Sequence, residues 1–176
     1  MQPLIYHVAS TLDGFICRTD GSVPGFVSTG AHVDTYQAQL AEYAAIVMGR
    51  ATYEAGYAYG MKPGDLPYGQ RPHHLFSATL SLPERSNLFI ERADAVAAID
   101  RIKAAASGPV YLCGGGKLAG HLLQHRRIDR LRLKLAPIIY GEGIRLFEKY
   151  DGLAEWQLIG CQQFDTGHAL LEYRLV

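Results

Sequence analysis

The sequence predicts an α/β fold in which a mostly parallel central sheet carries helices on both faces. Short apolar segments alternate with helical patterns along most of the chain, glycine-rich turns follow two of these segments, and the last stretch is rich in strands. A strand-rich end after such alternation is typical of an antiparallel edge on a parallel sheet. We find no internal repeat or linker, so residues 1–176 are expected to form one domain.

Five short apolar segments are predicted to be the parallel strands. They are residues 4–9, 45–48, 74–77, 87–90 and 110–113. Residues 130–136 alternate leucine with a basic residue, which predicts a strand that is exposed on one face. Residues 156–164 and 168–175 flank Asp165-Thr166-Gly167 and are expected to form a closing antiparallel hairpin.

Helical patterns lie between these strands. Apolar residues recur at helical spacing over 33–43, and Asp94 can cap a helix whose apolar face spans 96–102. A third helix is predicted over Leu118–His125. Residues 11–30 are expected to form a long loop with a small apolar island at Phe15-Ile16, and loops of this length often cover a site.

Charge and composition exclude several classes of function. Lys+Arg and Asp+Glu both number 17, so the excess basic charge of a nucleic-acid or anionic-membrane binder is missing. The 3 cysteines are odd in number and far apart, so we expect neither disulfides nor a metal site. The chain has no secretory leader pattern and no apolar window of membrane-spanning length, which predicts a cytoplasmic protein.

The run from Val110 to Leu118 is the most informative segment for function. An apolar strand leads directly into Gly114, Gly115 and Gly116, and a helical pattern follows. Glycine lets backbone N–H groups close on an anion, and the helix that begins there adds its positive end. The pattern therefore predicts a phosphate-binding turn, although a glycine turn that serves only packing has the same appearance.

A second segment, Met48–Tyr53, also follows an apolar strand. Within it, Arg50 offers a cationic fork and Thr52 a hydroxyl, and both groups suit a nucleotide phosphate. A surface ion pair is the alternative role for Arg50.

Eight segments in this order carry a family resemblance. They are Ser10–Ile16, Gly49–Tyr53, Ser77–Thr79, Gly114–Leu118, Ile128–Leu131, Pro137, Gly141–Gly143 and Leu146-Phe147. The chain resembles the dihydrofolate-reductase-like superfamily over its whole length, and more closely the reductase domain of the bifunctional riboflavin-biosynthesis deaminase-reductase and its stand-alone relatives. The resemblance implies the three-layer fold of that superfamily, in which helices cover both faces of the central sheet. It also implies a homodimer. The deaminase half of such enzymes requires zinc motifs that this sequence lacks.

The resemblance also implies NADPH as the cofactor and assigns residues to it. Gly49, Arg50 and Thr52 would meet the adenosine 2′-phosphate and the pyrophosphate, with Ser77 and Thr79 beside the adenosine half. The stretch Gly114, Gly115, Gly116, Lys117 and Leu118 would hold the pyrophosphate, and Ala9 and Ile16 would flank the nicotinamide. Ser77 and Thr79 can equally end a strand by turn chemistry.

Asp13 is the candidate catalytic acid near the nicotinamide. The dipeptide Asp13-Gly14 is also a strong turn signal, so a conformational role is the alternative. Asp34 competes for the same catalytic role. It lies on the polar side of its predicted helix, which favours a solvated residue. Asp129 is not expected to bind a ribose, because the resemblance places it at the start of a strand.

The implied reaction is hydride transfer from NADPH to an imine or aldehyde-like carbon of a small heterocycle or sugar adduct. In the riboflavin branch the substrate is 5-amino-6-(5-phosphoribosylamino)uracil. Arg18, Lys62, Arg71 and Lys117 are all open as anchors for a substrate phosphate. Three alternatives remain: a dihydrofolate reductase, a regulator that binds NADPH without turnover, and a structural α/β domain whose glycines serve packing.

Overall fold

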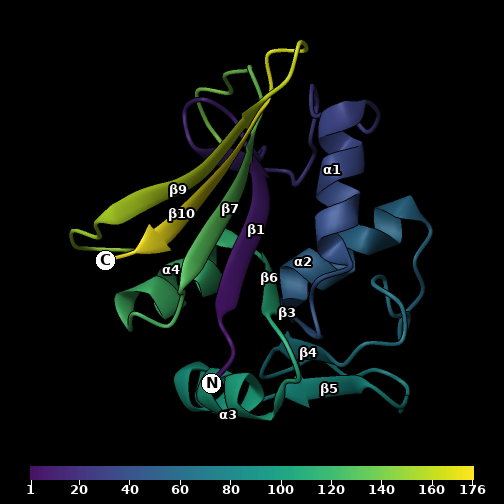
Figure 1. The fold of residues 1–176 in the computed structure, drawn as a ribbon. Helices are drawn as coiled ribbons and strands as arrows, with labels where there is room; N and C mark the ends of the chain where they lie inside the picture. The colour runs from purple at the N-terminus through teal and green to yellow at the C-terminus, as the bar shows by residue number, and fades with distance from the viewer.

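The computed structural model describes residues 1–176, and a strongly twisted eight-stranded sheet runs through the molecule (Figure 1). The strand order is β5-β4-β3-β6-β1-β7-β10-β9. The strands are β1 (Leu4–Ser10), β3 (Ala45–Gly49), β4 (His73–Phe76), β5 (Leu88–Glu91), β6 (Val110–Gly114), β7 (Arg130–Leu135), β9 (Trp156–Gln163) and β10 (Ala169–Leu175). Every pairing from β5 to β7 is parallel, whereas β10 runs antiparallel to β7 and β9. The predicted parallel sheet and closing hairpin are therefore confirmed.

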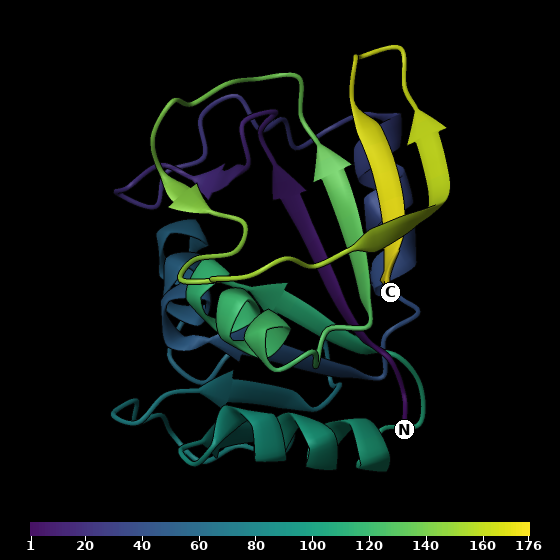
Figure 2. The ribbon, with the colours of Figure 1, turned by 90° about the vertical axis from the view of Figure 1, so that its left-hand side faces the viewer.

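Helices cover both faces of the sheet, which makes three layers (Figure 2). On one face lie α1 (Ala31–Leu40), α2 (Arg50–Ala55) and the 3₁₀ turn η1 (Gly56–Tyr59), and on the other lie α3 (Ala95–Ala105) and α4 (Gly116–Gln124). Each face of the sheet buries its own apolar cluster. Ile46 and Tyr111 belong to the cluster on the α1 face, and Val47 and Leu112 belong to the cluster on the face of α3 and α4. None of the helices has the length and apolar character that a membrane crossing requires.

The predicted capping role of Asp94 is confirmed. Its Oδ1 accepts a hydrogen bond of 2.9 Å from the N–H of Val96, at the start of α3. The helix after the glycines begins earlier than the apolar spacing indicated, at Gly116 instead of Leu118. The glycines therefore belong partly to the helix, which brings its first turn directly to the end of β6.

The long loop over residues 11–30 contains a strand that the sequence did not predict. The apolar island is β2 (Phe15–Cys17), which pairs antiparallel with β8 (Ile144–Arg145). Gly143 makes the pairing possible, because a Cβ there would lie 2.3 Å from the carbonyl oxygen of Cys17. The partner strand lies far along the chain and is only two residues long, so no local pattern could reveal it.

The prediction that β7 is exposed on one face holds at Arg130, whose side chain is 42% exposed, but is wrong for Arg132. The strand lies inside the sheet between β1 and β10, and α1 covers the face that carries its basic residues. The Arg132 side chain is only 12% exposed, and its guanidinium contacts Glu42 at 2.7 Å and Glu172 at 3.3 Å. Alternation identified the strand correctly, but it could not distinguish solvent from a covering helix.

Candidate functional site

The two glycine-containing segments meet at one edge of the sheet. Strands β3 and β6 are parallel neighbours, and Met48 lies opposite Gly114 in their register. A Cβ on Gly115 would lie 3.2 Å from Oγ1 of Thr52, and Gly114 has a φ of 126°, which favours glycine. The segments predicted separately therefore form a single turn region at the carboxyl ends of the strands, where open α/β sheets bind their ligands.

Two helices begin at this edge and present their amino termini to it. Helix α4 starts at Gly116 with Gly115 as its N-cap, and α2 starts at Arg50 with Gly49 as its N-cap. Neither cap supplies a side-chain hydrogen bond, so first-turn N–H groups of both helices have no capping side chain. Such N–H groups and the helix dipole together favour an anion.

Arg50 is held in place by its neighbours. Its Nε donates to Glu54 at 2.8 Å and its Nη1 donates to Thr79 Oγ1 at 2.9 Å, which leaves Nη2 without a protein partner. The Ser77 hydroxyl accepts from the N–H groups of Thr79 (3.3 Å) and Leu80 (3.0 Å), the turn chemistry considered from the sequence. The guanidinium is half-exposed and oriented beside the loop that follows β4.

The last three residues predicted to bind the pyrophosphate, Gly116, Lys117 and Leu118, differ in burial and in packing. A Cβ on Gly116 would lie 2.1 Å from the carbonyl oxygen of Arg145, so this glycine is required for packing. Leu118 packs against the core beneath α4, whereas Lys117 is exposed. Of the three, Lys117 has a side chain that is free to reach a ligand, and Gly116 can contribute its backbone.

The Asp13 carboxylate is occupied by three donors. Thr11 Oγ1 donates at 2.5 Å, the Gly141 N–H at 2.7 Å and the Tyr140 N–H at 3.2 Å. The bond from Thr11, followed by those from Gly141 and Tyr140, lowers the pKa of Asp13 to about 2. Asp13 therefore joins the loop after β1 to the loop after β7, and it is ionised at neutral pH.

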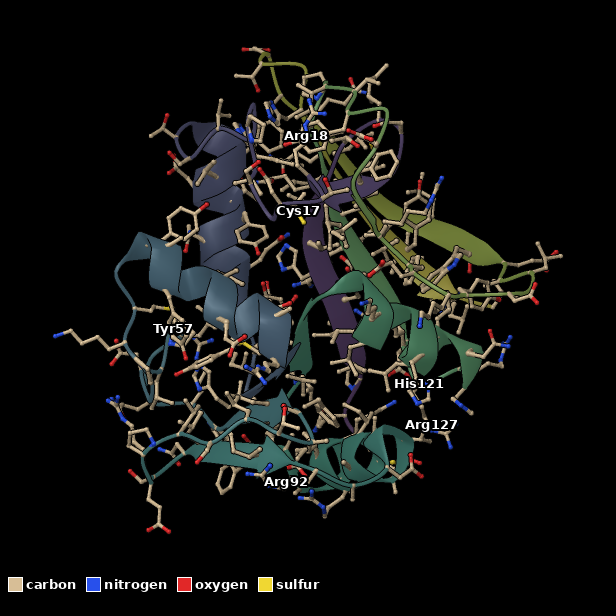
Figure 3. All side chains as sticks on the ribbon, turned by 180° about the vertical axis from the view of Figure 1, so that it is seen from behind. Cys17, Arg18, Tyr57, Arg92, His121 and Arg127 are labelled. Carbon is tan, nitrogen blue, oxygen red and sulfur yellow. The ribbon has the colours of Figure 1, made fainter.

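Ala9 and Ile16 both lie near the carboxyl end of β1 but belong to different layers. Ala9 is half-exposed on the α1 face of the sheet, and Ile16 in β2 packs against the apolar cluster of the opposite face. Figure 3 shows Cys17 and Arg18 above this end of β1. The Arg18 guanidinium lies 4.4 Å from the ring centroid of Tyr140 and donates to the carbonyl of that residue.

A cluster of aromatic and polar side chains lies under α1, and the sequence reasoning did not single it out. Tyr43 Oη lies 2.9 Å from His7 Nδ1, Tyr36 Oη lies 2.9 Å from Tyr111 Oη, and Tyr68 Oη lies 3.2 Å from Cys113 Sγ. Burial, followed by the charges of Arg132 and Lys134, lowers the pKa of His7 to about 3, so its imidazole is neutral. The only local signal was a tyrosine-rich composition.

The family model of the RibD C-terminal domain matches residues 2–170. This chain belongs to the RibD C-terminal domain family. The uncharacterized protein YwjB of Bacillus subtilis (strain 168) is 25% identical over 91% of this chain and 91% of its own length. A second uncharacterized protein of that organism, YyaP, is 23% identical over 97% of this chain and 93% of its own length.

Solved structures share the fold of this RibD C-terminal domain. A protein of Shewanella sp. PV-4 named for riboflavin biosynthesis superposes with a TM-score of 0.79 at 22% identity, covering 100% of this chain and 99% of its own. RibD of Acinetobacter baumannii gives 0.73 at 17% identity over 100% of this chain and 58% of that chain. Dihydrofolate reductase from Enterococcus faecalis gives 0.67 at 18% identity over 98% and 96% of the two chains. The dihydrofolate-reductase-like fold is thus confirmed.

Four further polar residues were considered from the sequence, and in this RibD C-terminal domain they are either bonded to the protein itself or exposed to solvent. The Arg71 guanidinium donates to the carbonyls of Leu40, Tyr43 and Tyr68, so it is not free to anchor a phosphate. Asp129 accepts from the Leu4 N–H and from Lys103 Nζ at the opposite end of β1. Lys62 is exposed, and so is Asp34, as its position on the helix indicated.

Proposed function

We propose that this RibD C-terminal domain is an NADPH-dependent reductase of the riboflavin-biosynthesis type. The observation that carries the proposal is the convergence of Thr52 and Arg50 with the Gly114-Gly115 turn at the carboxyl edge of the sheet. The region combines a backbone approach that a side chain would obstruct, the amino terminus of α4 and an oriented guanidinium. Those are the groups that a dinucleotide with a pyrophosphate and a 2′-phosphate requires.

The residues at this edge fit the cofactor. Backbone N–H groups of Gly115 and Gly116, with the Thr52 hydroxyl, would bind the pyrophosphate. Arg50 would pair its free Nη2 with the 2′-phosphate, beside the loop after β4. When bound, NADPH supplies a hydride. The contribution of the chain is to bind, to orient and to exclude water.

The substrate we propose carries an imine or aldehyde-like carbon, as in 5-amino-6-(5-phosphoribosylamino)uracil. It would lie on the α1 face beside Ala9. Asp13 is an unsuitable proton donor at neutral pH because three donors stabilise its ionised form. The proton would therefore come from water or from a substrate phosphate. No observation favours dihydrofolate reductase activity, because the sole carboxylate of α1, that of Asp34, is exposed.

The cofactor proposal is tested by titrating NADPH and NADH into the purified protein and following nicotinamide fluorescence. The wild type is expected to prefer NADPH. Arg50→Ala removes the 2′-phosphate contact and is expected to lose about 10- to 100-fold in NADPH affinity, the usual worth of a hydrogen bond to a charged group, with little change for NADH. Arg127→Ala is the matched control, because it removes a similarly exposed ion pair, with Asp100, remote from the glycine turn (Figure 3).

If neither nucleotide binds, the glycine turn serves packing and the proposal is overturned. If NADPH binds tightly but no aldehyde, imine or pterin acceptor oxidises it, the domain is an NADPH-binding regulator. If the Arg50→Ala protein keeps the wild-type preference for NADPH over NADH, a residue other than Arg50 binds the 2′-phosphate.

A further inference from the structure

Lys134 is a half-buried cation among uncharged rings. It is the penultimate residue of β7, opposite Ala9 in the register with β1, on the sheet face that α1 covers. Its Nζ lies 5.1 Å from the ring centroid of Tyr36, and that ring lies 4.3 Å from the ring of His7. Burial lowers the pKa of the Lys134 amine, because desolvation penalises its charge.

No acidic group or hydrogen-bond acceptor of the protein pairs with this ammonium. Arg132, two residues earlier on the same face, contacts both Glu42 and Glu172, whereas no carboxylate lies within 4.0 Å of Lys134. A partly desolvated charge without a partner is costly, and proteins normally pair such groups. Because Arg130 also contacts Glu172, at 3.4 Å, this face of β7 carries three cations against two carboxylates, and Lys134 is the cation that no carboxylate contacts.

His7 adds a second unused donor beside Lys134. Tyr43 Oη accepts from Arg132 Nη1 at 3.4 Å and lies 2.9 Å from His7 Nδ1, and we assign the phenol as the donor in that second contact. The ring proton of His7 is then on Nε2, which is buried and has no partner. Since His7 is 0% exposed, this N–H is an orphaned donor in the interior.

His32 completes the surroundings from α1. Its ring is buried, stacks on His168 with centroids 3.8 Å apart, and has no hydrogen-bond partner on either nitrogen. Burial, and then the charges of His168 and Lys134, lower its pKa. Around Tyr36, the covering helix and two strands therefore supply one unpaired cation and polar ring atoms without partners.

We propose that Lys134 and His7 determine substrate specificity by binding an anionic oxygen of a planar heterocycle, a carboxylate or a ring enolate. Tyr36 provides an aromatic surface at the same place. The proposal rests on the proposed function for the position of the reacting carbon beside Ala9, and it names the substrate class of that same site. Lys134 Nζ balances the negative charge, and His7 Nε2 donates a neutral hydrogen bond.

The chemistry of this group favours a single anionic oxygen over a phosphate. A phosphate is usually held by an arginine fork or by several backbone N–H groups. Here one ammonium and one neutral imidazole face an aromatic ring, and the nearby guanidinium of Arg132 is already paired with two glutamates. Any phosphate of the substrate would have to bind elsewhere.

The test uses isothermal titration calorimetry with three probes: orotate, its uncharged counterpart uracil, and ribose 5-phosphate. Each is titrated into the protein with and without saturating NADP⁺. The wild type is expected to bind orotate more tightly than uracil. Lys134→Met, similar in length and uncharged, is expected to weaken orotate binding about 10- to 100-fold, as for a lost hydrogen bond to a charged group, while uracil binding changes little. Lys134→Arg should retain part of the preference.

Lys149→Met is the control, because Lys149 is exposed and lies on the opposite side of the sheet near α4. Thermal unfolding of each variant verifies that it folds. The proposal is overturned if the wild type does not prefer orotate, if Lys134→Met keeps the preference, or if ribose 5-phosphate is the probe whose binding depends on Lys134. Orotate discrimination through Lys134 in a protein that does not bind NADPH would overturn the proposed function and leave this site standing.

Discussion

Asp13 shows how the donors around a single carboxylate decide what it can do. The dipeptide Asp13-Gly14 was predicted to be either a turn or part of a catalytic centre. In the structure Gly14 has a φ of 84° and the Gly14 N–H donates to the Thr11 carbonyl, so the turn is confirmed. The amides of Tyr140 and Gly141, which add to the Thr11 hydroxyl in lowering the pKa of Asp13, come from a distant loop that no local pattern could place beside it.

We expect Asp13 to make the protein sensitive to acid. Its folded-state pKa of about 2 lies below the ordinary value of 3.8, so its contribution is complete above pH 3.8 and is lost as the pH falls toward 2. Asp13→Asn removes the titrating group and should flatten this part of the stability profile. Urea unfolding between pH 2 and pH 5 measures the difference from the wild type.

Asp34→Asn serves as the control, because the Asp34 side chain is exposed and makes no hydrogen bond. A slope that stays the same in Asp13→Asn would show that Asp13 is not the anchoring group. A loss of turnover at neutral pH in a stable Asp13→Asn protein would instead restore its role in catalysis.

Lys134 marks the limit of sequence reasoning at this scale. Alternation over β7 identified the strand, and it indicated that basic residues face solvent. Arg132 and Lys134 are covered instead, because α1, a segment remote in the sequence, lies over them. Arg50 and Thr52 could be proposed from their own segment, since the groups that a phosphate requires are adjacent to a predicted strand end.

At the scale of elements, α4 packs through a glycine face against the end of β8 and the segment that follows it. Cβ atoms on Gly116 and Gly120 would lie 2.1 Å from the Arg145 carbonyl oxygen and 1.9 Å from that of Glu148. The Gly116 carbonyl accepts from the Glu148 N–H at 3.0 Å. The segment after β8 therefore lies directly on α4, and this contact positions the helix whose amino terminus forms the candidate phosphate site.

Gly120→Ala is expected to destabilise the protein by about 1–3 kcal/mol, because the added methyl overlaps backbone atoms that cannot move independently. For a domain of this size that corresponds to a decrease in Tm of about 2–12 °C. Calorimetric or circular-dichroism melting measures it. Gly108→Ala is the control, since a Cβ there meets only Ala44 at 3.5 Å. A Gly120→Ala protein as stable as the wild type would contradict the close packing of α4.

Most elements could be predicted because each has its own periodicity or cap, as Asp94 has for α3. The β2–β8 pair could not, because each strand is too short to show a pattern and their pairing depends on Gly143. Such short strands are specified by tertiary contacts with a distant partner, so they cannot be predicted from the local sequence.

At the scale of the whole molecule, strand order creates the candidate site. Residues 49–52 and 114–118 are far apart in the sequence, but β3 and β6 are neighbours in the sheet and both end at the same edge. The sequence indicated that each segment suits a phosphate, and the family resemblance placed them together. The strand order explains why one ligand can reach both.

The most direct test of that claim is a titration of the ¹⁵N-labelled protein with NADP⁺, followed through the backbone amide resonances. We expect saturable shifts concentrated in Gly49–Thr52 and Gly115–Leu118, because these amides would contact the pyrophosphate and 2′-phosphate. Resonances of α3, which lies away from this edge, should stay in place. Saturable shifts confined to other surfaces, or none at a concentration of NADP⁺ well above that of the protein, would contradict the account.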